Sequence, residues 1–363
     1  MDAPYTLIST PDALAAQLEA WAAAPWLAVD TEFVREETYY AQLCLVQLSD
    51  GAAHVCVDAL ALDPAPLLAV LMRPQPLKVL HSAGQDLELF VQRGGGCPAP
   101  LFDTQVAAAL LGHGEQLGYA ALVERRLGAK VDKSLTRTDW SKRPLSDAQL
   151  AYAADDVRHL AGLYPALRAE LAARGRLGWL EAECVRLADA ARYRPDPASA
   201  WRGVKGLGRL PPAAQHLAAR LAAWREEEAV RRNRPRRWIL DDAAVCQMAQ
   251  RKPGSLAALA EIEGVSARLV QRAGEALLAL VNAPAPDAPP LVPEARDTPA
   301  QKALIQSLLD LLRNRAQAEQ VAPALIATRG DIERLVREGP AAAIPLLSGW
   351  RRELLGEELL GKL

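Results

Sequence analysis

The hydrophobic periodicity of this chain changes near Leu117, and the change limits the folds that the chain can adopt. Before it, Trp26 to Asp30, Tyr40 to Ser49 and Ala53 to Val57 are apolar or alternating runs, as in a meander of strands. Helical and strand-like segments then alternate up to residue 111, which indicates parallel crossovers. Beyond Leu117 every long segment has helical periodicity. The sequence therefore predicts an α/β domain with a mixed sheet, followed by helical domains.

The length of 363 residues predicts two or three domains. The α/β domain is expected at 1–205, because Pro, Gly and Arg interrupt the helical pattern after it. A helical domain is expected at 211–283, a Pro/Ala linker at 284–297 and a second helical domain at 298–363. The formal net charge of −2 does not itself indicate a nucleic-acid binder, so local patches must decide that question.

The five cysteines are scattered without a C-x-x-C pair, which indicates neither a zinc ribbon nor a disulfide framework. Unpaired cysteines in a folded core are typical of a reducing compartment. The N-terminus lacks the basic and apolar regions of a signal peptide, and no run approaches about 18 apolar residues. We therefore expect a cytoplasmic protein with no membrane partner.

Two carboxylates end the first predicted strand, in Trp26-Leu-Ala-Val-Asp-Thr-Glu32. Alternate residues of a strand share a face, so Asp30 and Glu32 are expected to point the same way. Two anions about 4 Å apart repel each other, which favours either a raised pKa or a bound cation. Oxygen ligands suit Mg²⁺ or Mn²⁺. The alternative is a solvated strand exit without a ligand.

Two further acids lie on predicted helices. Asp86 begins a helix, where the helix dipole alone would also favour an acid. Tyr152 and Asp156 are four residues apart and share a helix face, next to a buried stripe that includes Leu150 and Val157. Each feature alone is a weak signal, but both occur downstream of Asp30 in one α/β domain.

The order of these motifs resembles that of the DEDD exonuclease superfamily, and Tyr152 points to its DEDDy subclass, because the sister subclass carries a histidine at the position of Ala151. His81-x-x-x-Gln85-Asp86, Phe102-Asp-Thr-Gln105 and Thr138-Asp-Trp-Ser-Lys-Arg-Pro-Leu145 resemble the ribonuclease D family in particular. Residues 229–242 and 259–264 resemble the helical HRDC (helicase and ribonuclease D C-terminal) domain, and 298–363 resembles a divergent second copy.

The resemblance implies a ribonuclease H-like (DnaQ-like) exonuclease domain followed by two all-α HRDC-like domains. It also implies a 3′–5′ exoribonuclease that releases nucleoside 5′-monophosphates with two divalent ions, Mg²⁺ or Mn²⁺. By position, Asp30, Glu32 and Asp156 would hold the ion that carries the attacking water. Asp30 would bridge to the second ion, with Asp86 assisting, and Tyr152 would orient the water. The implied substrates are RNAs with single-stranded 3′ ends, tRNA precursors among them.

Candidate substrate contacts are basic. The densest positive run contains Arg231 and Arg232 and then Arg234, Arg236 and Arg237, which predicts either a phosphate clamp or a solvated face. Trp238 beside the run either stacks on a base or anchors a core, and the HRDC resemblance favours the core. In the first domain, the candidate phosphate contacts are Lys133, Lys142 and Arg143.

Two other functions fit part of the pattern. The same acids would serve a 3′–5′ DNA exonuclease, because the motifs do not reveal contacts to the ribose 2′-hydroxyl. A catalytically silent RNA-binding scaffold is the second alternative, although all four acids and Tyr152 are present. No G-x-x-x-x-G-K-[ST] loop occurs, which excludes a P-loop motor and a nucleotide cofactor of that kind.

Overall fold

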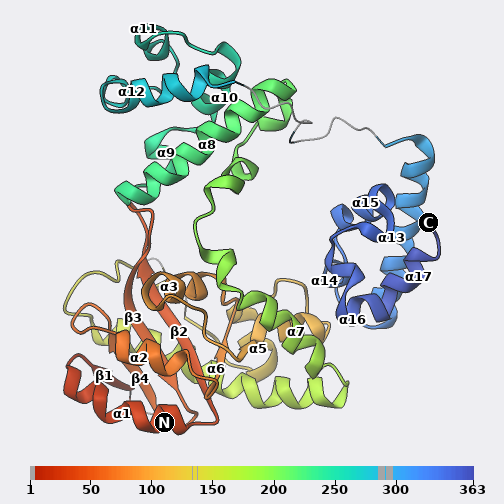
Figure 1. Cartoon of the computed structure of the whole chain (residues 1–363). Coiled ribbons are helices and arrows are strands. Elements are labelled where there is room, and N and C mark those ends of the chain that lie inside the picture. The colour runs from red at the N-terminus through yellow and green to blue at the C-terminus, as the bar shows by residue number, and fades with distance from the viewer. Residues whose placement is uncertain (1–4, 133, 137, 285–290, 292–296) are drawn as a thin grey trace. The chain divides into compact units, whose positions relative to one another are not determined.

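The computed structural model describes residues 5–132, 134–136, 138–284, 291 and 297–363 (Figure 1). The chain folds into two compact units. The first contains the residues up to Val34, Gln42–Tyr193 and Asp297–Leu363, and the second contains Arg35–Ala41 and Arg194–Arg296. This grouping differs from the predicted linear division, because a short N-terminal segment belongs to the second unit and the C-terminal helices belong to the first. The predicted domain boundaries stay a prediction.

Within the described residues, the sheet of the first unit has six strands in the order β1-β4-β3-β2-β5-β6. The strands are β1 (Tyr5–Ile8), β2 (Trp26–Val34), β3 (Gln42–Ser49), β4 (His54–Asp58), β5 (Leu77–Leu80) and β6 (Leu101–Asp103). β2, β3 and β4 form the predicted antiparallel meander, whereas β5 pairs in parallel with β2 and β6 pairs in parallel with β5. The mixed sheet is confirmed. The edge strand β1, parallel to β4, was not predicted.

Strand β2 is longer than the sequence pattern predicted. It continues to Val34 through an irregularity between Glu32 and Phe33, and β3 pairs with it from Ala28 onwards. Its other neighbour, β5, pairs only with Trp26, Leu27 and Ala28. The prediction that Asp30 and Glu32 end their own strand is therefore wrong. They lie within β2 but beyond the end of the short strand β5. At these two residues β2 therefore pairs with β3 on one side and has no described strand neighbour on the β5 side.

The helices of this part are α1 (Pro11–Ala23), α2 (Ala65–Leu71), α3 (Gly84–Gly94), α4 (Thr104–Leu110), α5 (Tyr119–Leu127), α6 (Asp147–Ala173), α7 (Leu177–Leu187) and the short 3₁₀ helix η1 (Ala190–Tyr193). Helix α6 begins with a capping box between Ser146 and Gln149 and packs across β2, β3 and β4. The predicted apolar stripe of α6 is buried against the sheet. This packing determines where along β2 the side chains of Asp156 and Tyr152 lie.

The C-terminal part of the first unit is helical. Its elements are α13 (Pro299–Ala318), α14 (Pro323–Ile326), α15 (Arg329–Glu338), η4 (Gly339–Ala341), η5 (Pro345–Leu347), α16 (Gly349–Arg351), the π-helical turn η6 (Arg352–Gly356) and α17 (Glu357–Leu360). Arg351 forms an ion pair with Glu183 of α7, and the Trp350 indole donates to the same carboxylate. The rings of Trp179 and Trp350 stack with their centroids 4.4 Å apart. These contacts attach the C-terminal helices to α7.

The second unit is also helical, with η2 (Pro197–Gly203), η3 (Leu207–Arg209), α8 (Pro212–Arg232), α9 (Arg236–Ile239), α10 (Asp242–Arg251), α11 (Leu256–Ala260) and α12 (Ala267–Asn282). Leu221, Met248 and Leu277 lie in its buried core. Residues Arg35–Ala41, which connect β2 to β3, belong to this unit. Within the described residues, none of the helices combines the length and the apolar composition that crossing a lipid bilayer requires.

Candidate active site

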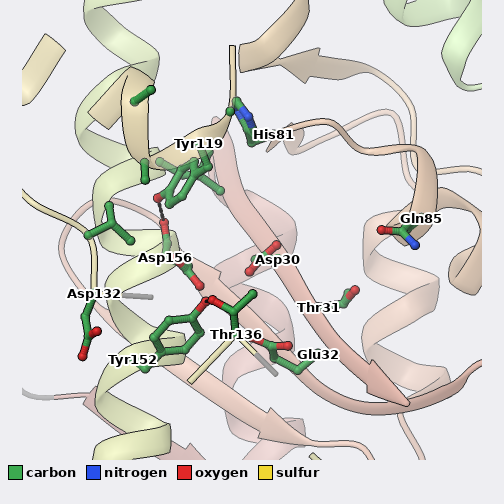
Figure 2. Close-up of a pocket in the computed structure, with 15 residues that line it drawn as sticks. Asp30, Thr31, Glu32, His81, Gln85, Tyr119, Asp132, Thr136, Tyr152 and Asp156 are labelled. Atoms are coloured by element: carbon green, nitrogen blue, oxygen red, sulfur yellow. Dashed lines mark hydrogen bonds between the residues drawn. The ribbon is translucent and has the colours of Figure 1, made fainter. Parts of the chain in front are cut away.

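Three of the four predicted acids meet above β2. Asp30 and Glu32 project from β2, and Asp156 projects from α6, so that one oxygen of each lies within 4.8 Å of the others (Figure 2). The sharing of one face by Asp30 and Glu32 follows from the two-residue period of the strand. Three carboxylates supply only hard oxygen ligands, which suit a divalent cation such as Mg²⁺ or Mn²⁺. The donor set therefore fits a metal ion.

The fourth acid, Asp86, lies apart from this group. It occupies the first turn of α3 and is buried, and its carboxylate accepts a hydrogen bond from the hydroxyl of Thr31. Thr31 lies between Asp30 and Glu32 on β2, so its side chain points to the other face of the strand. The structure thus links Asp86 to the acidic strand through Thr31, and Asp86 is not part of the group whose oxygens all lie within 4.8 Å of one another.

Burial and mutual repulsion raise the pKa values of these acids and so favour their protonated forms. Burial raises the pKa of Glu32 to about 9, and the carboxylates of Asp156 and Asp86 contribute to the rise. The pKa of Asp30 is raised by burial and then by Asp156, Asp86 and Glu32. Burial, followed by the neighbouring Asp155, raises the pKa of Asp156 to about 7. A divalent cation would remove this repulsion, so the electrostatics agree with a metal site.

Tyr152 lies one helical turn before Asp156 on α6, as the four-residue spacing predicted. Its hydroxyl is 3.5 Å from the hydroxyl of Thr136, and both residues line the same cavity (Figure 2). Burial, together with the Asp156 carboxylate, raises the pKa of Tyr152 to about 12. The phenol therefore stays protonated at neutral pH and can act as a hydrogen-bond donor rather than as a base.

Asp30, Glu32 and Asp156 line a cavity of about 590 Å³, a volume within the usual range of ligand pockets. His81, Gln85 and Tyr119 line it beside the acids. The Tyr119 hydroxyl donates to the backbone carbonyl of Asp156, and its ring centroid lies 5.3 Å from that of His81. No periodic pattern pointed to Tyr119, because its contact with α6 joins residues 37 positions apart.

The three basic candidates in the first unit differ in their surroundings. Lys133 lies outside the described residues. The side chain of Lys142 is 80% exposed, with its ammonium 3.9 Å from Asp139, so it remains available at the surface. Arg143 donates two hydrogen bonds of 2.7 Å to the buried Asp58 and others to main-chain carbonyls, including that of Cys44. These partners make Arg143 a structural residue in this structure.

Most arginines of the basic run pair with acids of their own unit. Arg231 and Arg232 face Glu228, Arg234 faces Glu37, and Arg236 faces the buried Glu226. Arg237 is exposed beside them. The favoured core role of Trp238 is wrong, because its side chain is 58% exposed and the Arg234 guanidinium lies 5.8 Å from its ring centroid. The short helix α9 turns Ile239 inward instead.

The comparisons with known proteins agree with this arrangement. A 3′–5′ exonuclease family matches residues 5–172, and the HRDC domain family matches residues 214–281. The chain is 44% identical to ribonuclease D of Acidiphilium cryptum, over 98% of this chain and 92% of that protein. It belongs to the ribonuclease D family. Ribonuclease D of Gluconacetobacter diazotrophicus is 42% identical over 98% of this chain and 91% of its own length.

A solved ribonuclease D has the same fold. The crystal structure of Escherichia coli RNase D, described as an exoribonuclease involved in structured RNA processing, matches with a TM-score of 0.89 and 34% identity over 99% of each chain. The predicted fold class, a ribonuclease H-like exonuclease domain followed by an HRDC domain, is confirmed. The predicted enzyme class, a 3′–5′ exoribonuclease, is confirmed at the level of the family. The HRDC character of residues 298–363 stays a prediction.

Proposed function

We propose that this protein removes nucleotides one at a time from the 3′ end of single-stranded RNA and releases nucleoside 5′-monophosphates. The observation that carries the proposal is the convergence of Asp30, Glu32 and Asp156 from two elements at one cavity, with Tyr152 beside them. Convergent acids in a cavity suit metal-assisted hydrolysis of a phosphodiester. Membership of the ribonuclease D family supports RNA as the polymer.

In this proposal Asp30, Glu32, Asp86 and Asp156 would hold two divalent ions, Mg²⁺ or Mn²⁺. Such ions lower the pKa of a bound water and stabilise charge on the entering and leaving oxygens. From the family resemblance, Asp30 would contribute to holding both ions. Asp86, whose carboxylate accepts from the Thr31 hydroxyl, would assist in holding the ions directly or through a water.

Tyr152 positions the nucleophile. Its protonated hydroxyl donates a hydrogen bond, and its place one turn before Asp156 directs that donor towards the acids. The Thr136 hydroxyl lies 3.5 Å from the Tyr152 hydroxyl and helps to hold it in place. The Tyr119 hydroxyl holds the main chain at Asp156, which keeps the third acid over β2. These contacts orient the acids and water without requiring any of the tyrosines to lose a proton.

The substrate is proposed to be RNA with an unpaired 3′ end, tRNA precursors among them. The terminal phosphodiester must enter a cavity to reach the acids, which a paired end does only when it frays. The HRDC domain offers Arg237 and Trp238, an exposed cation and an exposed aromatic ring at neighbouring positions, and such side chains are common in surfaces that bind single-stranded nucleic acid. A cytoplasmic location and a monomeric state stay predictions.

A strand-specific degradation assay tests the proposal. A 5′-labelled single-stranded RNA and the DNA of the same sequence are incubated with the protein in Mg²⁺, with and without a chelator. We expect a descending ladder on RNA that requires the metal and that the Asp30→Ala variant does not produce. Equal degradation of DNA would favour the DNA exonuclease, and binding of RNA without degradation would favour the silent scaffold.

A further inference from the structure

Gln47 carries an amide group that the fold of the first unit leaves unsatisfied. The residue lies in β3 and is fully buried. Neither Nε2 nor Oε1 of its side chain has a hydrogen-bond partner among the described residues. Burying an amide without partners is costly, so natural proteins rarely keep one unless it meets a ligand, a water or a functional group. A glutamine at this position therefore needs a reason beyond packing.

The register of the sheet places Gln47 directly beside the acids. Gln47 is the residue opposite Asp30 in the antiparallel pair of β2 and β3. Directly opposite residues point to the same face, with Cβ atoms about 4.5–5.5 Å apart. This is the face that α6 covers and to which Glu32 also points. The Gln47 side chain is therefore within reach of the Asp30 carboxylate.

The other groups around Gln47 are already engaged or apolar. On its other side lies Cys56 of β4, whose thiol is directed at the carbonyl of Leu150. Ser49, the next residue of β3 on this face, accepts from the main-chain N–H of Gly51 and pairs with the His54 ring. The buried α6 residues clustered with Cys56 are Leu150, Ala153 and Ala154, which have apolar side chains, and Tyr152 of α6 packs against the same cluster. Asp30, directly opposite Gln47, has a carboxylate that can accept a hydrogen bond from this amide.

We propose that Gln47 is a positioning residue for Asp30, whose side-chain amide donates a hydrogen bond to the Asp30 carboxylate in the metal-bound state. An ionised carboxylate accepts a hydrogen bond about twice as strongly as a neutral group, so the contact strengthens when Asp30 ligates a cation. The amide then fixes the orientation of the ligand oxygen, as outer partners of metal ligands commonly do. This inference rests on the metal site of the proposed function.

The test compares the wild-type protein with Gln47→Met, which keeps the length of the side chain and removes its donor and acceptor. Thermal melting is followed during titration with Mg²⁺ and separately with Mn²⁺. We expect the metal-free variant to melt at the same temperature or higher, because two unsatisfied polar atoms are removed. We expect its apparent metal affinity to fall on the order of 10- to 100-fold. Activity should fall at limiting Mg²⁺ and recover at saturating Mg²⁺.

Two further variants make the outcome unambiguous. Ser49→Ala, on the same strand and face, removes a hydrogen bond two residues away, so we expect a lower metal-free melting temperature with unchanged metal affinity. Asp30→Ala should abolish the metal-dependent shift. If wild type and Asp30→Ala responded alike to metal, the proposed site and this inference would both be wrong. If wild type bound metal normally and Gln47→Met bound it equally well, only the role of Gln47 would be overturned.

Discussion

The Tyr119 hydroxyl, at the start of α5, donates a hydrogen bond to the main-chain carbonyl of Asp156 in the middle of α6. Replacing Tyr119 by Phe keeps the ring against His81 and removes only this bond. Because the lost bond leaves Asp156 less firmly held, we expect the single-turnover rate to fall by about 5- to 30-fold, equivalent to about 1–2 kcal/mol. Circular dichroism should show an intact fold. A rate equal to wild type would mean that α6 holds Asp156 without help.

The Tyr152→Phe variant tests whether the phenol orients the nucleophile. The ring packing is preserved and the hydroxyl is lost, so we expect a partial loss of turnover, on the order of 10²-fold. The pKa of Tyr152 is raised to about 12 by burial and by Asp156, so it does not titrate in the working range. The shape of the pH–rate profile below pH 9 should therefore be the same in both proteins. A variant that lost a basic limb of the profile would instead identify Tyr152 as a base.

Metal affinity should depend on pH. Burial and neighbouring carboxylates raise the pKa of Glu32 to about 9, and burial raises those of Asp86 and Asp156 to about 7. Below these values the acids carry protons that a cation must displace, so affinity rises with pH and levels off above about 9. The rise should be steeper below about pH 7, where more acids are protonated. Calorimetry in buffers of different ionisation enthalpy would measure the released protons, and an affinity independent of pH would contradict this electrostatic picture.

The ion pair between Asp58 and Arg143 predicts a stability that is lost in acid. Burial alone would raise the pKa of Asp58, but the Arg143 guanidinium and main-chain N–H groups bring it below its ordinary value. The ion pair therefore stabilises the fold above the unfolded pKa of about 3.9, and this contribution is lost as pH falls through the lower folded pKa.

We expect Arg143→Met to reduce the free energy of unfolding by about 3 kcal/mol at pH 7, because a buried carboxylate loses its partner. The difference from wild type should shrink below about pH 3.9. Urea unfolding at pH 7 and at pH 3 measures both values. Lys142→Met, at the exposed neighbouring position, should have little effect at either pH. If Arg143→Met changed the free energy of unfolding as little as Lys142→Met, Arg143 would have no structural role.

Replacing two neighbouring arginines of the HRDC domain should affect different properties, RNA binding in one case and stability in the other. Arg237 is exposed, so Arg237→Ala should weaken RNA binding and reduce the slope of log affinity against log salt by about 0.7–0.9. Arg236 forms an ion pair with Glu226, whose side chain is 3% exposed, so Arg236→Ala should lower the melting temperature of the protein. Fluorescence anisotropy at several salt concentrations and thermal melting distinguish the two effects. Unchanged RNA binding by Arg237→Ala would make the basic run an ordinary solvated surface.

Local sequence patterns predicted most elements of the exonuclease fold, because these elements obey the periods of strands and helices. The strand Leu77–Leu80 and the helices around Gln85 and Leu67 lie where the pattern placed them. The extent of β2 was not predicted, because Glu32 and Phe33 continue as a strand only through pairing with β3. The edge strand β1 was missed for the same reason, since four residues acquire their conformation from β4.

The candidate site was predictable where its residues repeat at a regular spacing. Asp30 with Glu32, and Tyr152 with Asp156, are separated by one strand period and one helix turn. Their meeting depends on how α6 crosses the sheet, and the family resemblance supplied that link. The hydrogen bond between Thr31 and Asp86 joins residues 55 positions apart and leaves no local pattern. The exposure of Trp238 likewise depends on the turn of the short helix α9.

The connection between β2 and β3 limits where this chain can be truncated without disturbing the nuclease domain. Residues Arg35–Ala41 follow the strand of Asp30 and Glu32 but fold with the HRDC unit, where Tyr39 donates to Glu226 and stacks under Arg236. Ending the chain after Tyr193 would therefore remove the partners of a loop that remains. A nuclease truncated there would keep this loop without its partners and would also lack the C-terminal helices that contact α7, so a change in its activity would not measure the loss of the HRDC domain alone.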